Sequence, residues 1–331
     1  MASPSVALDL GTTTTYLRRT DRFLLERFPS AVAISTRTGQ LAACGEPAAA
    51  MLERTPAEIR ACRPLVGSVI ADYDMAVLML HEFFTKIQAV GFMKKPNVVV
   101  GIPCGVTEVE RRAVEDVLLD AGAKSVRTVP QILAAAYGAG IKVGSTRGSL
   151  IVDIGGGSTE CALLTGGSII HAKTAPVAGD EFDRAIMSYL RTAFGLIVGE
   201  GTANRVKHTV GVAHPSIDRG SMTVSGRSVE TGRAMTVEVS SVEVCEALRR
   251  PIAQILLRLR ATLEASPPEL VGDISKNGLV LCGGSAALPG IAKAIANGTG
   301  IRVATAKKSE ECVIQGLSHI LTSHIPPART K

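Results

Sequence analysis

Two stretches of the sequence place an aspartate, glycines and a run of hydroxyl side chains directly after an apolar segment. Asp9 and Asp153 are the acids, and each lies in a stretch rich in Val, Leu and Ile that is typical of a buried strand. Glycines after a strand let the backbone turn tightly and expose its N–H groups to a phosphate. The residues of the two turns are Gly11, Thr12, Thr13 and Thr14, and Gly155, Gly156, Gly157 and Ser158. Two such turns, about one domain length apart, predict two similar halves that close on one phosphate chain.

This pattern differs from the common nucleotide-binding loops. The sequence contains no GxxxxGK[ST] motif, and no GxGxxG stands where a predicted strand meets a helix. A P-loop and a Rossmann dinucleotide site are therefore excluded. One DxGGG alone could be a structural turn, but the second copy favours the phosphate-binding interpretation.

The hydrophobic pattern also predicts the elements that position these turns. Strands are predicted at 5–32, 97–101, 125–129, 150–154 and 168–172. Helices are predicted over 74–90, 107–121, 252–263 and 309–322. Thr107 and Glu110 form a capping box at the start of one helix. Thr55 before Pro56 predicts another helix start, and Pro251 predicts a kink or a new start.

Several longer motifs resemble a known family. They are DLGTTTT (9–15), RTPAEIRACRPL (54–65), GVTEVERRAV (105–114), VDIGGGSTE (152–160), AGDEFD (178–183), SPPEL (266–270) and LCGGSAALPG (281–290). They cover nearly the whole chain and resemble the actin/Hsp70/sugar-kinase ATPase superfamily and, within it, the bacterial MreB/Mbl family, of which the chain looks like a divergent paralogue. The resemblance implies an α/β, actin-like (Hsp70/actin/ribonuclease H-like) ATPase fold. In that fold two similar halves, each with a smaller inserted subdomain, surround a nucleotide cleft.

The resemblance also implies the order of the subdomains. The expected boundaries are 1–32 for the first part of subdomain IA, 33–75 for IB, 76–147 for the second part of IA, 148–180 for the first part of IIA, 181–250 for IIB, 251–308 for the second part of IIA, and 309–331 for the return to IA and the C-terminal tail.

ATP and Mg are the ligands that the resemblance implies. Asp9 and Asp153 would hold Mg through water, and they would act in catalysis with Gln131 and Ser158. The nucleotide would contact the two turns named above. Further nucleotide contacts are expected at Gly179, Asp180, Asn204, Arg205, Val206, Lys207, Gly283, Gly284, Ser285 and Ala286.

Position 131 departs from the family pattern. The family has a glutamate that orients the attacking water, whereas this sequence has Gln131 after Pro130. A glutamine can orient water through hydrogen bonds, but it cannot accept a proton. Actin is similar in having Gln in this role, so hydrolysis is not excluded. Because loss of a charged base costs roughly 10²–10⁴ in rate, we expect slow hydrolysis of ATP.

Two further departures concern the ribose and adenine side. In the family a glutamate and a lysine three residues apart share one helix face and hold this part of the nucleotide. Here the lysine is Lys207, but the glutamate is replaced by Asn204, and Ser285 stands where the family has another glycine. Weaker nucleotide binding is the expected result. With Pro130 and Gln131, these residues favour an accessory paralogue of the Mbl type.

The composition indicates the kind of hydrophobic core, the compartment and the kind of partner. The net charge is +6, and 46% of residues are hydrophobic but only 3% aromatic, so the core must be aliphatic. The seven cysteines form no CxxC and the six histidines no HxxxH, which predicts a reducing, cytoplasmic compartment without a zinc site. The basic charge suits an anionic membrane surface. No nucleic-acid motif accompanies it, so we expect no nucleic-acid partner.

One short segment has the character of a membrane contact. Phe92 and Met93 stand beside Lys94 and Lys95, so apolar tips could enter the interface while lysines meet lipid phosphates. In the alternative interpretation Phe92 folds back on the core and the lysines complement a helix dipole. We expect no signal peptide, anchor helix or transmembrane span. The predicted location is cytoplasmic, peripheral at the inner face of the cell membrane.

The function implied by the resemblance is cytoskeletal. The chain would polymerise into membrane-associated filaments and help determine cell shape by organising peptidoglycan synthesis, with slow ATP hydrolysis coupled to polymerisation. Its partners would be further copies of itself and RodZ-, MreC- and MreD-like membrane proteins. Two alternatives stay open: an accessory Mbl-type paralogue with weak ATP hydrolysis, and a small-metabolite kinase of the same fold. A chaperone would need a peptide-binding domain after the ATPase, which we do not expect.

Overall fold

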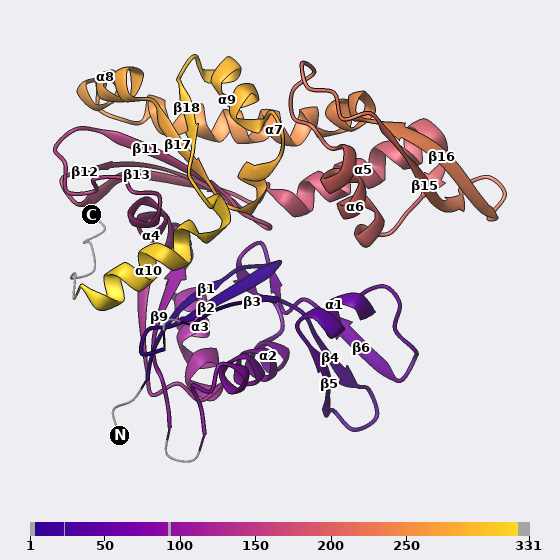
Figure 1. Ribbon diagram of the computed structural model, residues 1–331, viewed down its shortest axis with the longest axis horizontal. Helices are drawn as coiled ribbons and strands as arrows, with labels where there is room; N and C mark the ends of the chain where they lie inside the picture. Colours follow the sequence, from indigo (N-terminus) through magenta and orange to yellow (C-terminus); the bar gives the residue numbers. More distant parts are fainter. Residues whose placement is uncertain (1–3, 23, 92–93, 324–331) are drawn as a thin grey trace.

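A computed structural model describes residues 4–22, 24–91 and 94–323, and two five-stranded sheets organise it (Figure 1). The first sheet has the order β10-β9-β1-β2-β3 and the second the order β13-β12-β11-β17-β18. The strands of the first are β1 (Ser5–Leu10), β2 (Thr14–Arg19), β3 (Leu24–Pro29), β9 (Asn97–Ile102) and β10 (Ser125–Pro130). The strands of the second are β11 (Ser149–Ile154), β12 (Thr159–Thr165), β13 (Ser168–Ala175), β17 (Leu279–Cys282) and β18 (Val303–Thr305).

The two sheets repeat one topology. In the first, β1 is antiparallel to β2, β2 is antiparallel to β3, and β1, β9 and β10 run parallel. In the second, β11, β12 and β13 form the same antiparallel series, and β11, β17 and β18 run parallel. The prediction of two similar halves is confirmed. The turns after β1 and β11 therefore occupy equivalent places in the two halves.

Smaller sheets extend each half on one side of the molecule, to the right in Figure 1. They lie in the stretches for which inserted subdomains are predicted, and the subdomain boundaries themselves stay predictions. Beside the first sheet are β4 (Val32–Ser35), β5 (Leu41–Cys44), β6 (Ile59–Cys62), and the hairpin β7 (Leu65–Val66) and β8 (Val69–Ile70). Beside the second are β14 (Leu196–Ile197), β15 (Ser221–Ser228) and β16 (Ala234–Ser240).

Helices cover the sheets. They are α1 (Glu46–Met51), α2 (Tyr73–Lys86), α3 (Glu108–Asp120), α4 (Gln131–Gly138), α5 (Gly179–Phe194), α6 (Glu200–Val210), α7 (Ser241–Glu264), α8 (Pro268–Asn277), α9 (Ile291–Thr299) and α10 (Cys312–Thr322), with 3₁₀ turns η1 (Gly284–Ala287) and η2 (Ser309–Glu311). The capping box is confirmed: Thr107 caps α3 and its N–H donates to Glu110 over 2.6 Å. A new helix start at Pro251 is wrong, because α7 continues through this residue.

Helices α4 and α10 lie between the two sheets and join the halves (Figure 1). Their buried side chains share one cluster with residues of both sheets, including Ala7 and Ile151. The helices approach closely at two glycines, since a methyl group on Gly138 would collide with the carbonyl of Cys312, and one on Gly316 with the carbonyl of Ala134. The junction of the halves is therefore tightly packed.

The helix start expected at Thr55 is wrong. Residues 57 and 58 form a turn instead, in which the N–H of Ile59 donates to the carbonyl of Pro56 over 3.0 Å, and strand β6 follows. Ile59 and Ala61 alternate with the exposed Arg60 and pack against a small alanine cluster. This alternation with period two favours the strand over the local helix signal. Within the described ranges, no helix combines the length and the apolar character needed to cross a membrane.

Candidate functional site

A cleft of about 460 Å³ opens between the two halves. Its volume falls within the range of about 300–1,000 Å³ that is usual for small-molecule sites. Most of the predicted site residues line it. They are Asp9, Gly11, Thr12, Thr13, Thr14, Gln131, Asp153, Gly155, Gly156, Gly157, Ser158, Gly179, Asp180, Asn204, Lys207, Gly283, Gly284 and Ser285. Predicted residues up to 276 positions apart in the chain, Asp9 and Ser285, thus meet in one cavity.

Three residues predicted to contact nucleotide do not line the cleft. Arg205 is exposed on the outer side of α6, and Val206 is fully buried in the core of the second half. Ala286 is buried in η1, behind the cleft wall. Asn204 and Lys207 on the same helix do line the cleft, as their three-residue spacing requires.

The two glycine-and-hydroxyl turns face each other across the cleft. A methyl group on Gly157 would come within 2.5 Å of Thr12 Oγ1, and one on Gly156 would collide with Thr13 Oγ1. The glycines are therefore needed for the close approach of the second turn to the first. The arrangement brings backbone N–H groups and hydroxyls from both halves to one place, which suits a chain of phosphates.

A hairpin tip closes over the two turns, and sequence reasoning missed it. The N–H of Ser68, between β7 and β8, donates to Thr12 Oγ1 over 2.9 Å, and Ser68 Oγ lies 2.9 Å from Ser158 Oγ. Gly67 and Ser68 both have positive φ, 57° and 70°. A two-residue loop between apolar pairs, with glycine first, was the available signal for this hairpin.

Two buried carboxyl groups stand at the base of the cleft. Burial raises the pKa of Asp9 to about 8, with the nearby Asp153 adding to the effect. Burial also raises the pKa of Asp153 to about 6, and Gln131 partly opposes this because its Nε2 donates to Asp153 Oδ2 over 3.3 Å. Within the described residues neither acid forms an ion pair. An added cation would therefore stabilise both acids in their charged form.

These acids fit a magnesium ion held through water. No group of three or more His, Cys, Asp and Glu side chains within the described ranges could by itself enclose a metal. Magnesium instead keeps several waters and is commonly held by one or two carboxylates together with phosphates. Asp9 and Asp153, beside two phosphate-sized turns, provide that donor set.

A third buried acid, Glu160, lies behind this pair and ties the halves together. Its Oε1 accepts from the N–H of Cys104 over 2.5 Å and lies 3.3 Å from Thr174 Oγ1. The Thr174 hydroxyl donates to the carbonyl of Cys104 over 2.6 Å. Burial raises the pKa of Glu160 to about 8, with Asp153 contributing less. The side chain does not line the cleft, so its contacts are structural.

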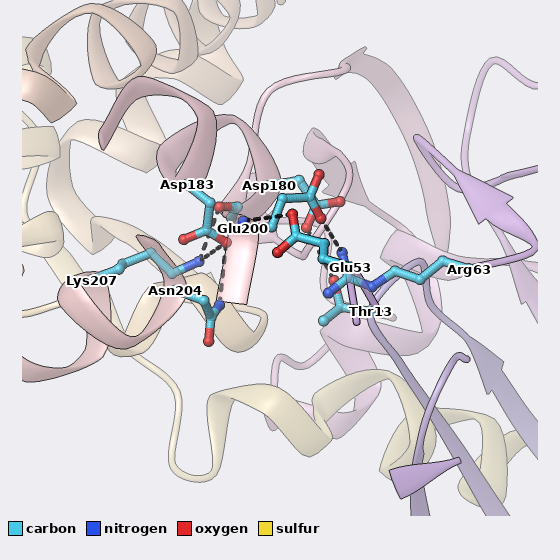
Figure 2. Close-up of polar contacts among 9 residues, drawn as sticks. Thr13, Glu53, Arg63, Asp180, Asp183, Glu200, Asn204 and Lys207 are labelled. Carbon is cyan, nitrogen blue, oxygen red and sulfur yellow. Dashed lines mark hydrogen bonds and ion pairs between the residues drawn. The ribbon is translucent and has the colours of Figure 1, made fainter. Parts of the chain in front are cut away.

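Helices α5 and α6 form the opposite wall (Figure 2). Lys207 Nζ donates to Asp183 Oδ2 over 2.8 Å and to the carbonyl of Gly179 over 3.0 Å. Asn204 Nδ2 donates to the same Asp183 oxygen over 3.2 Å. The Lys207–Asp183 ion pair is nearly buried, with side chains 11% and 9% exposed. These contacts fix the side chains that the wall presents to the cleft.

Several contacts cross the cleft and hold the halves together. Thr13 Oγ1 of the first half donates to Asp180 Oδ1 over 3.2 Å. Burial raises the pKa of Asp180, while the nearby Arg63 and Lys207 lower it. At the cleft mouth, Arg63 pairs with Glu200 at 3.4 Å, and Glu53 Oε1 accepts from the N–H of Glu200 over 2.8 Å (Figure 2).

Glu53 supplies the cap that helix α6 lacks in its own sequence. The N-cap residue is Gly199, which has no side chain to accept from the first turn. The Glu53 carboxylate lies so close to Gly199 that a methyl group there would displace it. A carboxylate at a helix N-terminus also complements the helix dipole. A residue of the first half thus caps a helix of the second.

Other lining residues were not anticipated from the sequence. They are Tyr16, Arg27, Ser68, Phe182, His208, Arg219, Ala287, Leu288, Pro289, Ser309, Glu310 and Val313. Tyr16 and Arg27 lie in register with Asp9 across β1, β2 and β3. The Arg27 guanidinium lies 6.0 Å from the Tyr16 ring centre, and Tyr16 donates to Glu310 Oε2 over 3.2 Å. The register could have been inferred from the alternation of the strands.

The buried acids predict an unusual pH dependence of stability. The pKa of Asp9 in the folded protein, about 8, lies above its usual value near 4, so the folded state binds the proton more tightly over that interval. Stability without divalent cations should fall as the pH rises from 5 to 8. In urea unfolding with EDTA, Asp9→Asn should stabilise the protein by roughly a few kcal/mol at pH 8 and by much less at pH 5.

Asp74→Asn is the matched control for this measurement, because Asp74 is an exposed acid in the first turn of α2. It should leave the slope of stability against pH unchanged. Equal stabilisation by Asp9→Asn at both pH values would contradict the assignment of a raised pKa to Asp9.

The cap supplied by Glu53 predicts local protection of α6. Glu53→Ala removes the acceptor for the N–H of Glu200, and loss of such a cap costs about 1 kcal/mol. Hydrogen exchange of the first-turn amides of α6 should accelerate roughly fivefold. Glu58→Ala, an exposed acid of the same segment, should leave these amides unchanged. Unchanged exchange in Glu53→Ala would show that the contact across the cleft does not hold in solution.

Comparison with known proteins links the chain to one family. The family model described as "MreB/Mbl protein" matches residues 3–326. Cell shape-determining protein MreB of Escherichia coli strain K12 is 38% identical over 321 residues, which are 96% of this chain and 92% of that protein. Cell shape-determining protein Mbl of Bacillus subtilis strain 168 is 34% identical over 321 residues, 97% and 96% of the two chains.

Solved structures are similar as well. MreB 5 of Spiroplasma citri bound to AMPPNP superposes with a TM-score of 0.92 at 33% identity, covering 98% of this chain and 97% of that one. A chain of the MamK double helical filament superposes with a TM-score of 0.82 at 19% identity, covering 98% and 100%, and supports the actin-like fold alone. On these grounds the chain belongs to the MreB/Mbl family.

Proposed function

We propose that this chain binds MgATP in the cleft, polymerises into actin-like filaments, and helps determine cell shape by organising peptidoglycan synthesis. The observation that carries the proposal is the pair of facing turns, in which Thr12 and Thr13 lie against Gly156 and Gly157, in a chain of the MreB/Mbl family. Relatives named cell shape-determining proteins support the cellular role. A similar structure that binds AMPPNP supports ATP as the ligand.

Residues of both halves contribute contacts to the nucleotide. The backbone N–H groups and hydroxyls of both turns surround the phosphates, and Asn204 and Lys207 face the ribose and base. A magnesium ion beside Asp9 and Asp153 would neutralise the charge of the phosphates and of these acids. Binding then fastens one half to the other, because each half contributes a turn.

Gln131 supports slow hydrolysis. It lines the cleft, and its amide nitrogen is engaged by Asp153 at 3.3 Å, which leaves its carbonyl oxygen to accept from a water molecule. This geometry orients water without removing its proton. The same observation favours the second candidate function, an accessory Mbl-type paralogue whose filaments turn over slowly.

The test combines sedimentation with phosphate release in the same samples. With MgATP we expect the protein to pellet and to release phosphate slowly. Gln131→Glu introduces a carboxylate that can take a proton, so phosphate release should rise by roughly 10²-fold while pelleting persists. Gln40→Glu, which adds the same charge at an exposed position of the loop between β4 and β5, should change neither quantity.

Three outcomes separate the candidates. Pelleting without measurable release in the unmodified protein supports the accessory paralogue. No pelleting with any nucleotide contradicts the filament and shifts the assignment to a monomeric kinase of this fold. A Gln131→Glu variant that is no faster than the unmodified protein contradicts the role of residue 131.

We also propose that the protein lies at the inner face of the membrane with RodZ-, MreC- and MreD-like partners. Lys94 and Lys95 are exposed, whereas Phe92 and Met93, predicted to insert, lie outside the described residues. Flotation with phosphatidylglycerol vesicles tests the contact: binding should be lost when Lys94 and Lys95 are replaced by Glu. Equal flotation with uncharged phosphatidylcholine vesicles would contradict the electrostatic part of this contact.

A further inference from the structure

Asp183 lies beneath the cleft wall rather than in it. It belongs to α5 and is 7% exposed, and it does not line the cavity. Its Oδ2 accepts from both Asn204 and Lys207, whose side chains do line the cavity. Its Oδ1 is buried and has no hydrogen-bond partner among the described residues. One carboxylate thus holds two residues of the cleft wall.

The chemistry of this carboxylate determines how the Asn204 amide is oriented. The Asp183 carboxylate forms an ion pair with the ammonium group of Lys207, 2.8 Å away. An ionised carboxylate can only accept hydrogen bonds, so Asn204 must turn its NH₂ group toward it. The carbonyl oxygen of Asn204 then lies on the opposite side, as Figure 2 shows. A flipped amide would place oxygen against oxygen.

We propose that Asp183 is a positioning residue for ribose recognition. By holding Nδ2 of Asn204, it presents Oδ1 of Asn204 to the cleft as a fixed acceptor for one of the two ribose hydroxyls. The neutral Asn204 then performs the acceptor role of a carboxylate at this position. The inference rests on the proposed binding of ATP, and it adds selection of ribose over deoxyribose at a named atom.

A purely structural role for Asp183 makes a different prediction. If the carboxylate only neutralised Lys207 and filled space, its loss would weaken every nucleotide to the same extent. Positioning of the Asn204 acceptor instead affects only nucleotides that carry the matching hydroxyl. The ratio of affinities for ATP and its deoxy analogues separates the two roles, because general destabilisation cancels in the ratio.

The experiment measures dissociation constants by calorimetry, with magnesium, for ATP, 2′-deoxyATP and 3′-deoxyATP. The unmodified protein should discriminate against one of the two deoxy analogues by roughly five- to tenfold, the effect of one neutral hydrogen bond. Asp183→Asn should reduce that ratio to within about twofold, because an amide at 183 can donate as well as accept and no longer dictates the orientation of Asn204.

Two further variants keep the test decisive if Asp183→Asn folds poorly. Asn204→Ala removes the acceptor, leaves the Asp183–Lys207 pair in place, and should abolish the discrimination equally. Glu181→Gln removes one carboxylate charge from the same helix, but Glu181 pairs with Arg184 and its side chain is 35% exposed, so the ratio should stay unchanged.

The outcomes distinguish this inference from the proposed function. ATP binding without discrimination in the unmodified protein overturns the inference and leaves the function intact. So does a ratio preserved in Asp183→Asn or Asn204→Ala. An unmodified protein that binds none of the three nucleotides contradicts the proposed function, and the inference with it.

Discussion

The burial of two carboxyl groups where the halves meet is the constraint on which the structure depends. Asp9 and Asp153 each lie near the end of the central strand of a sheet, and among the described residues the one side-chain hydrogen bond that reaches this pair comes from the neutral Gln131. The aliphatic core around them disfavours their charged forms. A cation bound here would relieve this cost, and ligand binding and folding would then be linked through the same two side chains.

The repeated topology explains why the acids can face each other. Because the turns after β1 and β11 are equivalent elements of two similar sheets, packing the sheets around α4 and α10 brings the turns together. Glycines at 138 and 316 set how closely these helices approach, and glycines at 156 and 157 set how closely the turns approach. The close approach of the backbone at these glycines therefore sets the shape of the site, and the hydroxyl and acidic side chains line it.

Local sequence patterns predicted the strands and turns around the site. They did not predict the contacts that cross the cleft. The strands around Asp9 and Asp153, the turns after them and the Thr107 capping box follow from periodicity and short-range chemistry. The helix expected at Thr55 does not form, because Ile59 packs against the alanine cluster as part of strand β6. The contacts of Ser68 with Ser158 and of Glu53 with Glu200 join residues 90 and 147 positions apart, and they exist only once the halves have closed.

Helix α6 is held at two places. At its N-terminus, Glu53 of the first half accepts from the N–H of Glu200, and one helical turn or more further on, Asp183 of the second half accepts from Lys207. A helix of 11 residues is a stiff rod about 16 Å long. If the halves moved apart while Glu53 kept its hydrogen bond to Glu200, α6 would have to tilt, and Asn204 would move with it. The opening of the cleft and the orientation of Asn204 would then change together.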